Sequence, residues 1–236
     1  LTESELSTLR PLVARRAKRE PLQHIIGNTS FRGFLINCDK RALIPRPETE
    51  MMVDFVIQEP SLSKEILIAD IGTGTGAIAI ALAKEIPSAK ILAVDISNDA
   101  ITLAKENAAL NQVEDRISFF EGSLLSALPA ECKPNVIVAN LPYIPLRDKE
   151  SLQEEVRLFD PALALFGGED GLDLIRSLLK ETKDHLASNG FIWLEIASGQ
   201  EKLLQKEISL YPWLSYCEAI DDFVGNTRFV KIQSKE

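Results

Sequence analysis

The chain has 236 residues, of which 45% are hydrophobic and 26% are charged, and its formal net charge is −9. This composition can fill one large core, and the negative charge argues against an extended nucleic-acid-binding surface. No apolar run reaches membrane-spanning length, no signal peptide opens the chain, and three distant cysteines fit a reducing compartment, so we expect a cytoplasmic protein without a membrane anchor.

The first fifty residues are predicted to form a separate segment attached to the main domain. Residues 1–20 favour a helix, and its basic end is interpreted as a solvated face. The short apolar runs of residues 22–26 and 33–37 flank a turn-rich stretch, which indicates a β-hairpin. Residues 43–50 contain two prolines, and the Glu-Thr-Glu that follows them suits the start of a helix over residues 51–58.

From residue 66 onward, apolar strands alternate with helices. Strands are predicted at residues 66–72, 90–95, 116–122, 135–140, 190–196, 214–220 and 227–233. Helices are predicted at residues 76–86, 98–110, 172–187 and 199–210, with a long loop before the third of them. This alternation predicts an α/β fold of the Rossmann-like type, with a mostly parallel seven-stranded sheet and helices on both faces.

The first strand of this series runs directly into the loop Gly72-Thr73-Gly74-Thr75-Gly76. Glycines allow a tight turn and let a ligand lie against the backbone, while the next helix begins with free N–H donors. The second strand ends at Asp95, whose carboxylate suits the two hydroxyls of a ribose. This order predicts a nucleoside site. The alternative is a tight turn with Asp95 capping the following helix.

The strict Gly-x-Gly-x-Gly spacing with an acid at the end of the second strand resembles class I S-adenosylmethionine-dependent methyltransferases more than NAD enzymes. The fourth strand ends in Asn140-Leu141-Pro142-Tyr143, which is similar to the Asn-Pro-Pro-Tyr of methyltransferases that act on planar nitrogens. Their substrates are the amino groups of adenine and cytosine or the side-chain amide of glutamine. The resemblance implies S-adenosyl-L-methionine as the cofactor, with Asn140 beside the transferred methyl group.

A planar nitrogen is a poor nucleophile because its lone pair is conjugated. The side-chain oxygen of Asn140 and the carbonyl of Leu141 can accept its two N–H groups, and Tyr143 can pack on its face. These acceptors also stabilise the positive charge that develops on nitrogen. The alternative for Pro142 and Tyr143 is a turn that only caps the strand.

These residues are also compatible with two other functions. The form with Leu141 is also typical of ribosomal-RNA adenine dimethyltransferases, whereas amide-directed enzymes usually have proline at that place. A non-catalytic RNA- or protein-binding module can also keep a nucleotide fold, although the glycine loop and the Asn140 motif are both intact here.

Four further segments resemble release-factor glutamine methyltransferases. These segments are residues 19–27, 43–50, 156–172 and 222–228. They occur in the same order as in that family and together extend over nearly the whole chain. Because of this resemblance, the chain is identified as a member of that family. The substrate of the family is the glutamine of the Gly-Gly-Gln loop in peptide-chain release factors. The acidic composition fits a protein substrate better than ribosomal RNA.

The resemblance implies the roles of particular residues. It places the methionine and ribose parts of the donor on residues 72–76 and Asp95, the adenine edge near Ser123 and Leu124, and the methyl group beside Asn140.

The resemblance also implies that Pro45, Arg46, Pro47 and Glu48 line the substrate mouth. A structural ion pair between Arg46 and Glu48 is the alternative. No metal site is expected.

The expected division is residues 1–20 as the remnant of an N-terminal helical domain, 21–50 as the hairpin and substrate-side loop, and 51–236 as the methyltransferase domain. Members of the family usually begin with a separate helical domain, and the chain starts at Leu1 rather than Met, so Leu1 is expected near the end of that domain. A monomer is expected.

Overall fold

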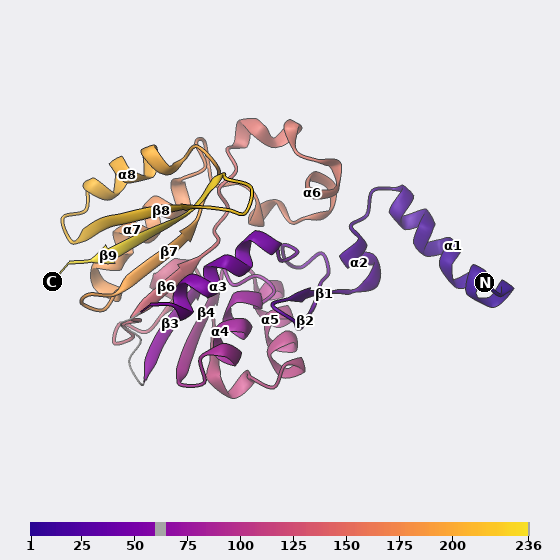
Figure 1. Ribbon diagram of the computed structural model, residues 1–236, viewed down its shortest axis with the longest axis horizontal. Helices are drawn as coiled ribbons and strands as arrows, with labels where there is room; N and C mark the ends of the chain where they lie inside the picture. The colour runs from indigo at the N-terminus through magenta and orange to yellow at the C-terminus, as the bar shows by residue number, and fades with distance from the viewer. Residues whose placement is uncertain (60–64, 236) are drawn as a thin grey trace.

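The computed structural model describes residues 1–59 and 65–235. At its centre is a seven-stranded sheet (Figure 1). The strands in chain order are β3 (Ile66–Ile71), β4 (Ala89–Asp95), β5 (Ile117–Glu121), β6 (Val136–Ala139), β7 (Phe191–Glu195), β8 (Leu214–Asp221) and β9 (Thr227–Ser234). Across the sheet they lie in the order β5-β4-β3-β6-β7-β9-β8, parallel from β5 to β7, with β9 antiparallel to both of its neighbours. The prediction of a mostly parallel seven-stranded sheet is confirmed.

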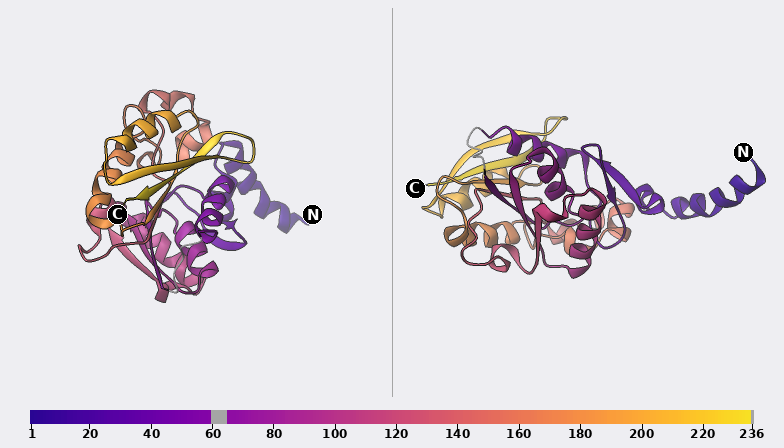
Figure 2. Two further views of the ribbon diagram at one scale, coloured as in Figure 1. Left: turned by 60° about the vertical axis from the view of Figure 1, so that its left-hand side comes forward. Right: turned by 90° about the horizontal axis from the view of Figure 1, so that it is seen from below.

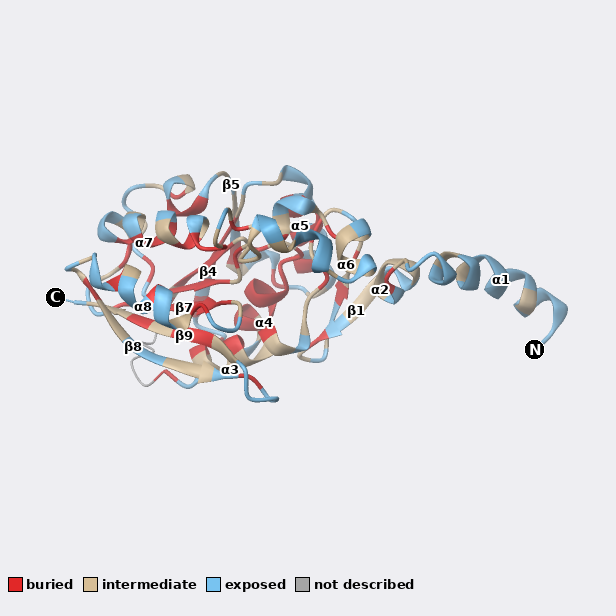
Figure 3. Ribbon diagram, turned by 90° about the horizontal axis from the view of Figure 1, so that it is seen from above, coloured by how far each residue is buried: buried red, intermediate tan, exposed pale blue. Residues whose placement is uncertain are grey.

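Helices cover both faces of this sheet. One face packs against α3 (Glu50–Ile57), α4 (Ala77–Glu85) and α5 (Asn98–Leu110), and the other against α7 (Asp173–His185) and α8 (Glu201–Ser209). Successive side chains of a strand point to opposite faces, so Ile68 of β3 belongs to the first apolar layer and Ala69 to the second. Figure 3 shows the buried residues gathered in the sheet and on the inner sides of these helices.

The N-terminal helix α1 (Glu3–Ala17) projects away from the body of the protein (Figure 2). It begins with a capping box between Thr2 and Glu5, and none of its residues is buried. Beyond its C-terminal end, Arg19 lies 3.6 Å from Glu154 of α6 (Glu154–Phe159), and Arg16 of α1 forms a 2.7 Å ion pair with Glu155.

The hairpin differs from its prediction at its first strand. Residues 22–26 form the short helix α2 (Leu22–Ile26), and the hairpin pairs β1 (Asn28–Phe31) with β2 (Phe34–Asn37). Pro21 has a backbone φ of −54°, which suits a helix start, and Gly27 ends the helix with a φ of 87°. The predicted strand at residues 22–26 is therefore wrong, because these two residues bound a helical turn.

The hairpin is fixed to helix α5 and to the loop after β3 by the buried side chain of Asn107 in α5. Its Oδ1 accepts a hydrogen bond from the backbone N–H of Asn37 at 2.8 Å, and its Nδ2 donates to the carbonyl of Thr75 at 2.9 Å. One amide thereby joins the hairpin, a helix and the loop after β3.

The segment between β6 and α7, predicted as a long loop, contains helix α6 and two of the 3-10 helices. The 3-10 helices of the described residues are η1 (Pro47–Thr49), η2 (Glu114–Arg116), η3 (Leu124–Ala127), η4 (Leu146–Ser151) and η5 (Ala162–Ala164). Across residues 1–59 and 65–235, no helix is both long enough and apolar enough to span a membrane.

Candidate active site

The loop after β3 is held tightly against the sheet and against the residues that follow β6. The backbone N–H groups of Gly72 and Thr73 both donate to the carbonyl of Val94 at 2.9 Å. Gly72 has a φ of 75°, and a Cβ added there would lie 3.1 Å from Leu141 Cδ2. The positive φ favours glycine at this position, and a side chain would in addition have to displace Leu141 by a few tenths of an ångström.

Buried Asp70 supports the same loop from beneath. Its Oδ2 accepts hydrogen bonds from the hydroxyl of Thr73 at 2.7 Å and from the N–H of Ala79 at 3.1 Å. Burial raises the pKa of Asp70 to about 7, because the apolar surroundings disfavour the charged carboxylate. The loop and the first turn of α4 are thus tied to one buried acid.

Asp95 braces the loop from the end of β4. Its Oδ2 accepts from the N–H of Gly74 and its Oδ1 from the N–H of Ser97, each at 2.9 Å. The helix α5 is capped by Ser97, whose hydroxyl oxygen accepts from Ala100 N–H, so the alternative that Asp95 is this cap is wrong. Burial raises the pKa of the Asp95 carboxyl. Each of its oxygens has a further lone pair that can accept a ligand hydroxyl.

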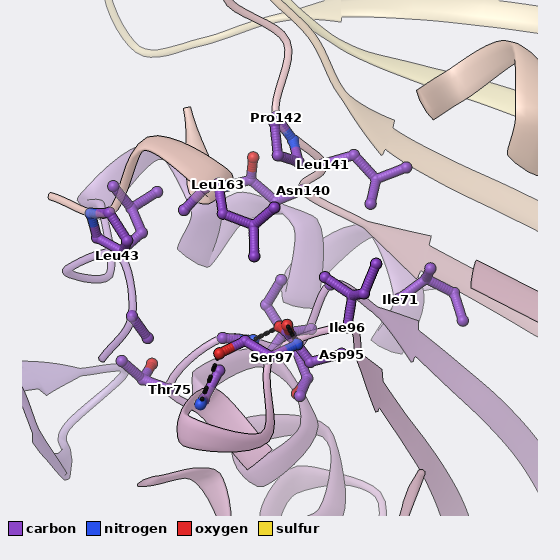
Figure 4. Close-up of a pocket in the computed structure, with 18 of the residues that line it drawn as sticks. Leu43, Ile71, Thr75, Asp95, Ile96, Ser97, Asn140, Leu141, Pro142 and Leu163 are labelled. Atoms are coloured by element: carbon purple, nitrogen blue, oxygen red, sulfur yellow. Dashed lines mark hydrogen bonds between the residues drawn. The ribbon is translucent and has the colours of Figure 1, made fainter. Parts of the chain in front are cut away.

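A cavity opens above these residues at the carboxyl ends of β3, β4, β5 and β6. Figure 4 shows Asp95 and Ser97 along one side and Asn140, Pro142 and Leu163 along the other. The residues predicted from the sequence that line this cavity are Pro45, Arg46, Gly72, Thr73, Gly74, Thr75, Asp95, Ser123, Leu124, Asn140, Leu141 and Pro142.

Gly76 does not belong to that lining. It precedes α4 with a φ of 81°, and a Cβ added there would lie 3.1 Å from the Cβ of Ala104 in α5. The third glycine of the loop therefore allows two helices to pack closely.

A second cavity lies on the other side of the Asn140 motif. Both cavities are lined by Asn140, Leu141 and Pro142, whereas Tyr143 and Glu195 line only the second. Leu43, Arg46 and Ala164 also line both cavities, so groups bound in the two cavities can approach each other along this shared wall. Such an arrangement suits transfer of a small group between two ligands.

The proline-rich loop of residues 43–50 contributes to the wall that the two cavities share. Arg46 lines both, and its guanidinium forms a 2.8 Å ion pair with buried Asp160, so the alternative of an Arg46–Glu48 pair is wrong. Burial raises the pKa of Asp160, and the charge of Arg46 opposes that rise. Pro47 is exposed, and neither Pro47 nor Glu48 is among the described residues that line the cavities.

Two functional candidates were not found by sequence reasoning: Thr49 and Glu195, both buried. The Thr49 hydroxyl donates to Glu195 Oε2 at 2.7 Å and lies 3.1 Å from Asn140 Nδ2. The hydroxyl of Tyr143 donates to the other carboxylate oxygen at 3.3 Å. Burial raises the pKa of Glu195, partly opposed by Thr49 and Arg228. The available signal was a charged residue at the carboxyl end of the apolar strand β7, the same pattern that identified Asp95.

Two family models match parts of the chain. One is ribosomal protein L11 methyltransferase (PrmA), over residues 47–151, and the other is the PrmC N-terminal domain, over residues 1–27. The chain is similar to the release factor glutamine methyltransferase of Deinococcus radiodurans, with 41% identity over 219 residues, which is 93% of this chain and 76% of that relative. The protein of the same name from Geobacter sulfurreducens is 39% identical over 218 residues, 92% of this chain and 74% of the relative.

The fold is similar to that of ribosomal protein L11 methylase from Lactobacillus delbrueckii subsp. bulgaricus. The TM-score is 0.60 at 23% identity, and the match covers 83% of this chain and 82% of the other. At this identity the similarity establishes the fold alone, and it confirms the predicted methyltransferase-type sheet.

Proposed function

Since the chain belongs to the release factor glutamine methyltransferase family, we propose that it methylates the side-chain amide nitrogen of the glutamine in the Gly-Gly-Gln motif of peptide-chain release factors. The observation that carries this function is the pair of cavities that meet at Asn140, Leu141 and Pro142. One cavity suits the methyl donor and the other the glutamine side chain.

The first cavity fits S-adenosylmethionine in three respects. Gly72 lines the cavity with backbone alone, Asp95 provides a carboxylate for ribose hydroxyls, and Leu124 provides apolar surface for an adenine ring. When bound, S-adenosylmethionine supplies a methyl group on a positively charged sulfonium. We assign residues 72–75, Asp95, Ser123, Leu124 and Asn140 to this ligand, with Gly76 shaping the loop.

Asn140 and Leu141 hold the accepting nitrogen. The Asn140 side-chain oxygen and the Leu141 carbonyl accept its two N–H groups, which orients its lone pair toward the first cavity. As the nitrogen becomes positively charged, both oxygens bind it more strongly, and this difference lowers the barrier. Pro142 stiffens the turn, and Tyr143 borders the second cavity beside the amide.

The remaining assignments follow from the same proposal. Residues 43–50, with Pro45, Arg46, Pro47 and Glu48, form the substrate-side loop next to the hairpin. Residues 1–20 belong to an N-terminal helical part, and residues 51–236 form the catalytic domain. The protein acts in the cytoplasm as a monomer on a protein substrate rather than on nucleic acid, in keeping with its net charge of −9.

An assay with tritiated donor tests this function. A release factor and ribosomal RNA are offered side by side in one reaction and then separated. The proposal expects label in the release factor alone. Label in the RNA would favour an adenine methyltransferase, and label in neither would favour a binding module.

A further inference from the structure

We propose that Thr49 and Glu195 are positioning residues that fix the side-chain amide of Asn140 with its oxygen toward the accepting nitrogen. This inference rests on the proposed function, because it concerns how Asn140 meets its substrate. Thr49 precedes α3, Glu195 ends β7 and Asn140 follows β6, so three distant segments supply the arrangement.

The orientation follows from counting hydrogens. A threonine hydroxyl has one proton, and the 2.7 Å contact commits that proton to the acceptor Glu195 Oε2. The hydroxyl oxygen of Thr49 can then only accept a hydrogen bond from its other neighbour, the side-chain amide of Asn140. The group at 3.1 Å must therefore be the Nδ2 of Asn140, as observed. Rotating the amide by half a turn would set two oxygens against each other.

Both oxygens of the Glu195 carboxyl act as hydrogen-bond acceptors. Thr49 donates to one of its oxygens and Tyr143 to the other. Among the charged groups that face it, Arg228 on β9 favours the ionised form, whereas Glu48 of η1 disfavours it. Thr49 and Glu195 are 4% and 2% exposed, so water does not readily replace either partner.

The fixed orientation has a chemical consequence. With Nδ2 bound to Thr49, Oδ1 is the part of the amide that remains for a ligand in the cavities that Asn140 lines. An amide free to rotate would present N–H groups to the N–H groups of the substrate for part of the time. A mispositioned catalytic group of this kind costs roughly 100-fold in rate.

The test compares Thr49→Val, which keeps the shape and removes the hydroxyl, with Thr49→Ser, which keeps the hydroxyl. Thr182→Val is the matched control, because the buried hydroxyl of Thr182 also accepts one hydrogen bond, from Trp213, and donates another, to the carbonyl of Leu179. Each variant is assayed for kcat and KM with a Gly-Gly-Gln peptide. Titration with S-adenosylhomocysteine and thermal melting report donor-site integrity and folding.

We expect Thr49→Val to lower kcat by roughly 10- to 100-fold while the Kd for S-adenosylhomocysteine stays within about twofold. Thr49→Ser should recover most of the rate. Thr182→Val should lose thermal stability and keep its kcat. A normal kcat in Thr49→Val, or an equally low kcat in Thr49→Ser, would overturn the positioning role.

A second readout does not depend on activity. The side-chain amide protons of Asn140, followed by nuclear magnetic resonance, should exchange slowly with solvent in the parent chain and in Thr49→Ser, and fast in Thr49→Val. Unchanged exchange in Thr49→Val would refute the inference even in an inactive protein. A parent chain that leaves release factor unlabelled would instead refute the proposed function.

Discussion

The carboxylate of Asp95 accepts a hydrogen bond from the backbone N–H of Gly74 at 2.9 Å, across 21 positions of sequence. This bond joins the end of β4 to the loop that follows β3. The same carboxylate therefore shapes the loop and faces the cavity that the loop lines. A change at Asp95 should affect ligand binding through both roles.

Replacement of Asp95 by alanine should weaken binding of the donor or of S-adenosylhomocysteine by roughly 10- to 100-fold, because hydrogen bonds to a charged group contribute about 1.5–3 kcal/mol. Isothermal titration calorimetry measures this effect. Glu121→Ala is the matched control, since Glu121 is paired with Asp95 in the sheet register but is exposed and outside the described cavity linings. Equal losses in both variants would contradict the ribose role of Asp95.

The raised pKa of Asp70 predicts a pH dependence of folding. This carboxyl has a pKa of about 7 in the folded chain because of burial, against an ordinary value of 3.8. Between these values the folded state keeps a proton that the unfolded state has lost, so the free energy of unfolding falls as the pH rises through this range. Without donor, the parent chain should lose more thermal stability between about pH 5 and about pH 8 than Asp70→Asn does.

Asp99→Asn is the control for that comparison, because Asp99 is an exposed aspartate in the first turn of α5. It should keep the pH dependence of the parent chain. Identical pH profiles for the parent chain and Asp70→Asn would show that Asp70 does not titrate in this range.

Replacement of Gly72 by alanine should lower both donor affinity and stability. The added methyl group would lie 3.1 Å from Leu141 Cδ2, and a φ of 75° costs a residue with a side chain about 1–2 kcal/mol. Gly199→Ala is a matched control, with a φ of 90° and no described atom within 4 Å of its added Cβ. It should lose stability only through its backbone conformation and keep its donor affinity. A Gly72→Ala variant that binds donor normally would show that the ligand does not need the space beside Gly72.

The side chain of Asn140 should matter for turnover rather than for donor binding. Asn140→Ala should lower kcat by roughly 100- to 1000-fold, because it removes an acceptor whose hydrogen bond strengthens in the transition state. Asn135→Ala, at the start of the same strand segment, removes another hydrogen-bonded amide and should leave kcat unchanged. If instead donor affinity collapsed and kcat at saturation stayed normal, the role assigned to Asn140 would be wrong.

The sheet and most of the first cavity were predictable because their signals are local. Apolar runs such as residues 66–71 predict buried parallel strands, and glycines or acids at strand ends predict the ligand edge. The helix at residues 22–26 was missed because five residues are too few to show a helical period. The contact of Thr49 with Glu195 spans 146 positions, so the fold, rather than any motif, brings them together.

The most direct measurement identifies the atom that receives the methyl group. A Gly-Gly-Gln peptide is labelled with heavy nitrogen at its glutamine side chain, incubated with the chain and S-adenosylmethionine, and hydrolysed in acid. Our account predicts methylamine that carries the heavy nitrogen, and none from a peptide with glutamate in place of glutamine. Methyl transfer to both peptides alike, or hydrolysis that yields no methylamine with heavy nitrogen from the glutamine peptide, would contradict it.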